Sequence, residues 1–336
     1  MCIRDSPYAV GVDIACRVKL TIYDTPASQI ERNIQPLSQA IEKNTSFGIG
    51  AQFKHAKTHP VLDQDWGFSK YVSSLRDKAW RQLGSSGSGN HFVEFGAIEL
   101  KDEFQGVPKG SYLALVSHSG SRGTGAMIAN HFSKVAAKKH PKLPKKMKHL
   151  SWLSLDEEEG QEYWQAMNLM GDYASANHYL IHRDISKMVG GEILAQVENH
   201  HNFAWKEQHL GRELIVHRKG ATPAAEGELG YIPGTMTAPG FLIAGKGEAT
   251  SLNSSSHGAG RAMSRKAARH KITASGLKKV AKDNGVTLLD AGLDEAPLAY
   301  KDIFTVMKAQ SDLVAVLGTF YPKIVKMAPD GEKAED

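Results

Sequence analysis

The chain has 336 residues, of which 41% are hydrophobic, and a formal net charge of +5. This length supports one large core or two ordinary domains. The sequence has no run of about 18 apolar residues and no charged-then-apolar start, so we expect neither a membrane span nor a secretory signal. Cys2 and Cys16 are the only cysteines, which excludes a disulfide framework and favours a reducing, cytoplasmic location.

The first half of the chain alternates apolar runs with glycine- and serine-rich turns. Residues 1–6 look unrelated to the rest of the chain, so we expect a non-native start there, then a single domain over 7–327 and a charged tail over 328–336. The apolar residues 7–18 predict a buried strand with a polar bend at Asp13 and Cys16. Further patterns predict strands at 19–24, 91–95 and 111–117, helices at 28–43 and 62–83, and a loop at 45–60.

The second half begins with a lysine-rich run. Residues 138–148 hold six lysines and two prolines, which usually indicates a solvated surface, although an edge that faces RNA is the alternative. Residues 162–188 have the apolar spacing of a long helix. The remaining patterns predict more helix at 191–198, strands at 213–216 and 323–327, a turn at 232–236 that leads into an apolar segment at 241–244, and helices at 262–283 and 302–308.

Three histidines end or begin strand-like runs, and an Asp/Cys pair lies in another. The five residues are Asp13, Cys16, His91, His118 and His201. This mixture of oxygen, sulfur and nitrogen ligands suits Mn²⁺, Fe²⁺, Co²⁺ or Zn²⁺. Five ligands exceed one tetrahedral site, and a thiolate can bridge two ions, so a two-metal centre fits. The alternative is that the histidines are capped loop residues and Cys16 belongs to the core.

Glycine- and serine-rich loops beside basic residues are typical of phosphate sites, and they occur at 119–122, 218–220 and 254–261. A Walker-type loop is absent, so a nucleotide would be held differently. Within the third loop, His257 precedes Gly258 and the helical pattern that starts at 262. A neutral imidazole can attack phosphorus and form a covalent intermediate. The alternatives are a further metal ligand or an ordinary loop histidine.

Eight stretches in order resemble the RtcB-type RNA ligase family, which joins RNA 3′-phosphate and 5′-hydroxyl ends. They are Gly11-Val12-Asp13-Ile14-Ala15-Cys16, Gly89-Asn90-His91-Phe92-Val93-Glu94, His118-Ser119-Gly120-Ser121-Arg122-Gly123, His201-Asn202, Arg218-Lys219-Gly220-Ala221, Pro233-Gly234-Thr235-Met236, His257-Gly258-Ala259-Gly260-Arg261 and Asp294-Glu295-Ala296-Pro297. The resemblance implies an α+β fold with mixed sheets, surrounding helices and a central cleft for metal and nucleotide. It also implies GTP- and Mn²⁺-dependent joining of 3′-phosphate or 2′,3′-cyclic phosphate ends to 5′-hydroxyl ends, in tRNA splicing or RNA repair.

The resemblance further assigns roles to single residues. His257 would carry GMP, and Asp13, Cys16, His91, His118 and His201 would bind two Mn²⁺ ions, with Cys16 as the bridge. Glu94 would accept hydrogen bonds from guanine and so favour GTP over ATP. The other residues implied to contact the nucleotide are Asn90, Asn202, Thr235, Gly258, Ala259, Gly260 and Lys326. The expected RNA contacts are Arg122, His217, Arg218 and Lys219.

The chain also departs from the family pattern, because a segment that precedes the Asp13–Cys16 stretch in the family is expected to be absent.

Two other classes of function stay open. One is a two-metal phosphoesterase that acts on nucleotides or cyclic-phosphate RNA and never holds GMP. The other is a non-catalytic RNA-binding protein that uses the lysine-rich run.

Overall fold

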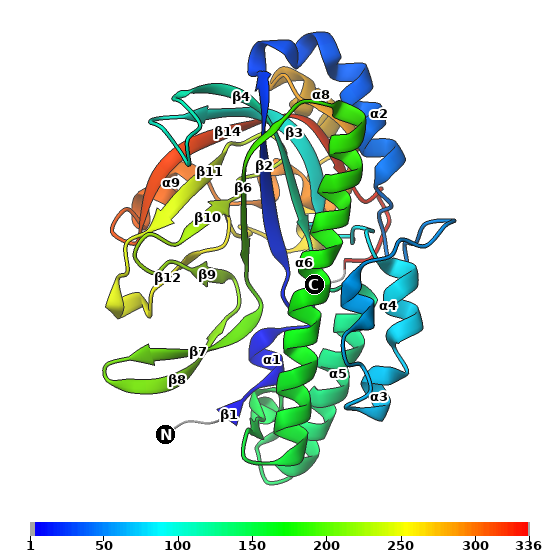
Figure 1. Cartoon of the computed structure of the whole chain (residues 1–336), viewed down its shortest axis with the longest axis vertical. Coiled ribbons are helices and arrows are strands. Elements are labelled where there is room, and N and C mark those ends of the chain that lie inside the picture. The colour runs from blue at the N-terminus through cyan, green and yellow to red at the C-terminus, as the bar shows by residue number, and fades with distance from the viewer. Residues whose placement is uncertain (1–3, 335–336) are drawn as a thin grey trace.

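The computed structural model describes residues 4–334, and Figure 1 shows a curved sheet with helices along one face and at one end. The strands are β1 (Arg4–Asp5), β2 (Arg17–Pro26), β3 (Phe92–Leu100), β4 (Gly110–Ser119), β5 (Leu153–Ser154), β6 (Ile193–His200), β7 (Phe203–His209), β8 (Arg212–Arg218), β9 (Ala221–Pro223), β10 (Leu229–Ile232), β11 (Gly240–Gly245), β12 (Ser254–Ser256), β13 (Thr287–Asp290) and β14 (Val314–Met327). The α-helices are α1 (Pro7–Val10), α2 (Ile34–Asn44), α3 (Lys70–Ser73), α4 (Arg76–Gln82), α5 (Arg122–Lys139), α6 (Glu158–Val189), α7 (Arg265–Lys271), α8 (Ala274–Asp283) and α9 (Ile303–Ala309).

The main sheet has the strand order β10-β11-β14-β3-β4-β2-β6, and β13 joins β14 in parallel. The sheet curls so far that its two edge strands approach each other, and the backbone N–H of Tyr231 in β10 donates to Oδ1 of Asn199 in β6 at 2.8 Å. Alternate residues of each strand point toward the concave, inner face of the sheet. Val18, Leu20 and Val116 are among those that fill it with a buried apolar cluster.

The outer face of the sheet packs against α2 and α6, as Figure 1 shows. Phe95 and Leu115 of the sheet form one buried cluster with Ile41 of α2 and Ile181 of α6. Hydrogen bonds add to this contact, because Oγ of Ser117 in β4 lies 2.6 Å from Nδ1 of His178 and 2.8 Å from Nε2 of His182, both in α6. Strand β4 is therefore fixed to the long helix at the residue before His118.

The lower part of α6 carries a second, helical layer. Helices α1, α3, α4 and α5 surround it (Figure 1), and Phe132, Tyr163 and Tyr173 are among the fully buried side chains of their shared core. The antiparallel pair β7–β8 projects from the body beside this layer. In the part of the chain that the structure describes, no helix is long and apolar enough to cross a membrane.

The α+β architecture that the resemblance implies is confirmed, as are the strands near 19–24, 91–95, 111–117, 213–216 and 323–327 and the long helix over 162–188. The apolar segment at 241–244 lies in strand β11. Four local predictions are wrong. The predicted strand at 7–18 begins with helix α1, because Pro7 supplies a helical φ at the first position. The predicted helix at 191–198 is strand β6, since Gly190 and Gly191 both adopt positive φ and end α6.

The other two errors are helices that were predicted as continuous and are broken in the structure. Residues 62–83 contain a 3₁₀ turn and the short helices α3 and α4, and α7 ends at Lys271 before Thr273 caps α8. Apolar periodicity continues across such breaks, so it does not reveal them. Of the expected non-native start, residues 1–3 lie outside the described residues, whereas Arg4 and Asp5 pair with β5.

Candidate active site

The five predicted metal ligands meet at one end of the curved sheet, on its inner face. His118 lies in β4 opposite Val18 of β2 and Phe92 of β3. Cys16 precedes β2 and His91 precedes β3, while His201 follows β6 and donates its backbone N–H to the Cys16 carbonyl at 2.8 Å. Because Val18 and Val116 point into the curve, the side chains two residues away from them, Cys16 and His118, point there too.

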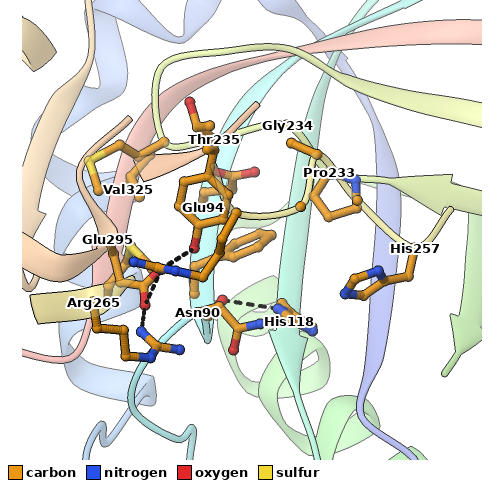
Figure 2. Close-up of a pocket in the computed structure, with 18 residues that line it drawn as sticks. Asn90, Glu94, His118, Pro233, Gly234, Thr235, His257, Arg265, Glu295 and Val325 are labelled. Atoms are coloured by element: carbon orange, nitrogen blue, oxygen red, sulfur yellow. Dashed lines mark hydrogen bonds and ion pairs between the residues drawn. The ribbon is translucent and has the colours of Figure 1, made fainter. Parts of the chain in front are cut away.

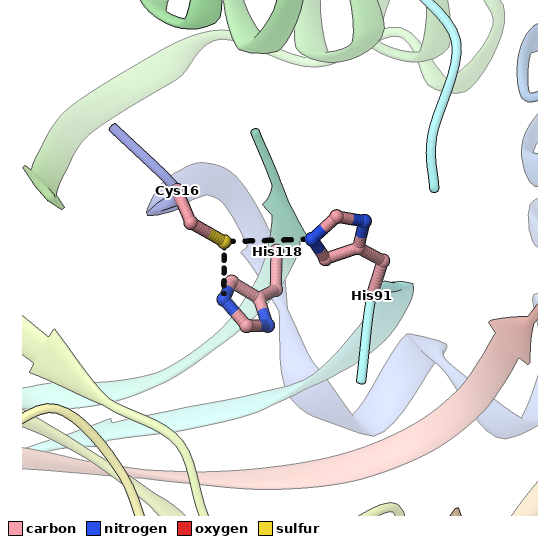
Figure 3. A group of neighbouring side chains, drawn as sticks. All are labelled: Cys16, His91 and His118. Carbon is pink, nitrogen blue, oxygen red and sulfur yellow. Dashed lines mark hydrogen bonds between the residues drawn. The ribbon is translucent and has the colours of Figure 1, made fainter. Parts of the chain in front are cut away.

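Figure 3 shows Cys16, His91 and His118 facing one another. Their potential ligand atoms all lie within 4.8 Å of one another, and all three side chains are buried. The Cys16 Sγ is 3.0 Å from Nε2 of His118 and 3.4 Å from Nε2 of His91. Asp13 and His201 extend the group, because Oδ2 of Asp13 is 2.9 Å from Nε2 of His91 and the Nε2 atoms of His118 and His201 are 3.4 Å apart.

The hydrogen bonding of His118 leaves its inward nitrogen able to bind a metal. Its Nδ1 lies 2.9 Å from the Asn90 carbonyl, which only accepts, so Nδ1 carries the proton and Nε2 of the neutral ring has the lone pair. Burial, with a smaller effect of His91, lowers the pKa of His118 to about 3. Burial also lowers the pKa of His201 well below its ordinary value. Both rings are therefore neutral, which is the form that binds metal ions.

Two neighbouring residues, Gly120 and Asn202, lie very close to Asp13. A Cβ atom on Gly120 would lie 2.0 Å from Oδ1 of Asp13, so only glycine fits there. Asn202 adopts a positive φ of 55° and donates from Nδ2 to the Asp13 carbonyl at 3.3 Å. The converging oxygen, sulfur and nitrogen donors fit one or two divalent ions of the Mn²⁺ to Zn²⁺ series.

A pocket opens beside the metal-ligand group, and His257 lies at one of its ends (Figure 2). The ring centroids of His257 and His201 are 4.6 Å apart. His257 follows β12, and its backbone N–H donates to the Gly220 carbonyl at 3.4 Å. The predicted helix directly after this loop is wrong, because α7 begins only at Arg265. The helix start therefore does not supply N–H groups next to His257.

The predicted nucleotide residues Asn90, Glu94, Thr235, Gly258, Ala259 and Gly260 all line this pocket. Glu94 is 5% exposed on the inner face of β3, where its strand neighbours are Val116 and Val325. Burial among these apolar groups raises the pKa of Glu94 to about 8. Thr235 has a second role, because its Oγ1 accepts the backbone N–H of Ala238 at 3.1 Å and closes a turn.

Sequence reasoning missed an ionic cluster on the pocket wall. Arg261 donates to Glu295 at 3.3 Å and to the Asp294 carbonyl at 2.7 Å. Arg265 pairs with both Asp294 and Glu295, and the Tyr300 hydroxyl donates to Glu295. A signal was available, since Asp294-Glu295-Ala296-Pro297 is one of the matching stretches, but nothing in the sequence shows which basic residues it meets.

Several predicted contact residues lie elsewhere. Lys326 is absent from the pocket lining, because its strand neighbours Val325 and Met327 face the pocket and successive strand residues point to opposite faces. Its Nζ instead lies 5.8 Å from the Phe47 ring centroid. The Lys326 side chain thus lies outside the pocket that Glu94 lines, and the contact with guanine that the resemblance implies stays a prediction.

Three of the four expected RNA contacts are held by the protein itself. Arg122 is 1% exposed and donates to Ser85 at 3.1 Å. Arg218 pairs with Glu207 at 2.6 Å and is 2% exposed, and His217 lies 2.7 Å from the buried Asp5 carboxylate. These three side chains thus make contacts within the protein, and their expected contact with RNA stays a prediction. Lys219 alone of the four is exposed.

Comparison with known proteins identifies the family of the chain. The family model described as tRNA-splicing ligase RtcB matches residues 5–327. The chain is similar to the RNA-splicing ligase RtcB of Escherichia coli (strain K12), with 33% identity over 93% of this chain and 81% of that protein. It is also similar to the tRNA-splicing ligase RtcB of Methanococcus maripaludis, with 30% identity over 97% of this chain and 81% of that protein. The chain therefore belongs to the RtcB family.

Proposed function

We propose that this protein is an RNA ligase that uses GTP and Mn²⁺ to join RNA 3′-phosphate or 2′,3′-cyclic phosphate ends to 5′-hydroxyl ends. The observation that carries the proposal is the contact between His257 and His201, with ring centroids 4.6 Å apart. It puts a candidate nucleophile beside a buried Cys/His ligand group, at one end of the pocket that Glu94 also lines. The names of the relatives support RNA ligation as the activity.

The arrangement supports a defined orientation of GTP. Asp13, Cys16, His91, His118 and His201 would hold Mn²⁺, which supplies positive charge that neutralises and orients phosphates. The guanine base would then extend toward Glu94, whose carboxylate accepts from the adjacent N1–H and N2–H groups of guanine. Adenine lacks this pair of donors, so Glu94 favours GTP over ATP.

In the first step, a ring nitrogen of His257 attacks the α-phosphorus, a P–N bond forms, and the bond to the β-phosphate oxygen breaks with release of pyrophosphate. In the second step, an oxygen of the RNA 3′-phosphate attacks the same phosphorus and His257 leaves. A 2′,3′-cyclic end is first opened by water to the 3′-phosphate. Finally the 5′-hydroxyl oxygen attacks the RNA phosphate, the phosphodiester forms, and GMP leaves.

The test is a joining assay with two RNA strands, one that ends in a 3′-phosphate and one that begins with a 5′-hydroxyl. Ligated product is expected with GTP and Mn²⁺ and not with ATP. Product should also require the 3′-phosphate, because a 3′-hydroxyl end cannot be activated by GMP transfer. Release of inorganic phosphate or cleaved cyclic ends, without any joined product, would instead identify a two-metal phosphoesterase.

A further inference from the structure

The lysine-rich segment, residues 134–148, carries a strong local positive charge. Residues 131–155 contain seven lysines and no aspartate or glutamate. Lys139 pairs with Glu157 at 2.6 Å and with Glu159 at 2.8 Å. The other six are exposed, and within residues 4–334 none of them has a carboxylate partner; they are Lys134, Lys138, Lys142, Lys145, Lys146 and Lys148. Their charge is therefore available to a polyanion.

This segment packs beside α1, at the end of the molecule that carries the helical layer. It runs from the C-terminal part of α5 through the 3₁₀ helix Lys145–Leu150. The residues that line a surface depression there include Tyr8, Lys134, Lys148 and His149. Tyr8 of α1 is 49% exposed, and its ring lies edge-on to His149 at a centroid distance of 4.9 Å.

Tyr8 also connects the depression to the active site. The Nζ of Lys219 lies 4.8 Å from the centroid of the Tyr8 ring. Lys219 is exposed and directly precedes Gly220, whose carbonyl accepts the backbone N–H of His257 at 3.4 Å. Basic and aromatic side chains thus succeed one another over the surface, from the loop at His257 to the lysine-rich segment.

We propose that this row, named here the lysine track, binds the backbone of the RNA substrate where it leaves the joining site. The track consists of Lys219, Tyr8, His149, Lys148, Lys134 and the further exposed lysines of the segment. Ammonium groups bind successive phosphates and release condensed counterions, and an exposed aromatic ring offers a surface on which a base stacks. The inference rests on the proposed function, since that function places RNA ends at His257.

The test compares two variants that each lose four exposed lysines. The track variant carries K142A, K145A, K146A and K148A. The matched control carries K101A, K109A, K278A and K282A, which lie in the β3–β4 connection and α8, at the other end of the molecule. Neither set touches the metal ligands or the pocket. GMP labelling of the protein without RNA should therefore be unchanged in both.

The first measurement is the affinity for a single-stranded RNA with a 3′-phosphate at several salt concentrations, by fluorescence anisotropy. The track variant should bind about tenfold more weakly, and its log–log salt slope should fall by up to about 3, from about 0.7 per lost phosphate contact. The control should keep the wild-type slope. Equal losses in both variants, no loss in the track variant, or no RNA binding by the wild type would each overturn the proposal.

The second measurement separates the track from the chemistry. Ligation is compared for RNA strands of about 4 and about 20 nucleotides, which bracket common single-strand site sizes. The track variant should lose efficiency through a higher KM on the long strands only. Equal efficiency on both lengths would contradict the track while leaving the ligase intact. Failure of the wild type to form GMP-labelled protein would instead refute the proposed function, and the affinity measurement would still decide the track.

Discussion

Replacement of Glu94 by glutamine should stabilise the protein in a pH-dependent way. A carboxyl whose pKa rises from 4.5 to about 8 on folding favours the folded state below 4.5, and that contribution is lost as the pH rises toward about 8. Each pH unit between the two pKa values changes the free energy of unfolding by about 1.36 kcal/mol. Ionisation of Glu94 therefore lowers the free energy of unfolding by about 3 kcal/mol at pH 7 and by under about 1 kcal/mol at pH 5. Glutamine does not titrate, so the free energy of unfolding of E94Q should rise by about 2 kcal/mol relative to that of the wild type between pH 5 and pH 7.

The assay is urea unfolding of both proteins at pH 5, 6, 7 and 8, without nucleotide. GTP with Mn²⁺ should reduce the difference, because the two guanine donors stabilise the ionised carboxylate that burial disfavours. E94Q should therefore also bind GTP more weakly while it unfolds at higher urea concentration. A stability difference that stays constant from pH 5 to pH 8 would refute the argument, since it would show that Glu94 is ionised in the folded pocket.

Three further substitutions test the site geometry. Gly120→Ala should weaken Mn²⁺ binding measured by calorimetry, because the new Cβ would lie 2.0 Å from the Asp13 carboxylate; unchanged binding would show that Asp13 is not a ligand. His118→Ala should abolish Mn²⁺ binding in the same assay, since it removes the nitrogen 3.0 Å from the Cys16 sulfur, and wild-type affinity would rule out this centre. Lys326→Ala should leave GTP affinity unchanged in an equilibrium binding assay, because the residue lies outside the pocket lining; a large loss would restore its predicted contact with guanine.

The sequence predicted which side chains come together in the Cys/His group better than it predicted the surroundings of that group. Cys16, His91 and His118 occur where apolar strand patterns begin or end, and strand pairing brings such positions together. The location of Lys326 could not be predicted in this way, because a shift of one residue along a strand turns a side chain to the other face. Arg122 and Arg218 look like phosphate ligands in sequence, but their partners Ser85 and Glu207 come from distant segments.

Local errors in the fold have the same origin. The pattern of residues 191–198 resembles helix, yet the segment pairs with β2 as an edge of the main sheet. Helix and strand patterns are hard to separate in short apolar runs, and tertiary pairing decides between them. The ionic cluster around Glu295 could not be predicted from the sequence either, because folding alone brings Arg261, Arg265 and Tyr300 to this carboxylate.

The most direct test of the central claim is covalent labelling of His257. The wild-type protein and H257A would each be incubated with Mn²⁺ and GTP labelled at the α-phosphate, and then separated on a denaturing gel. We expect acid-labile label on the wild-type protein alone, because a phosphorus–nitrogen bond to histidine is labile in acid. Label that persists on H257A would contradict the assigned nucleophile, and metal-loaded wild-type protein that takes up no label would contradict the ligase mechanism itself.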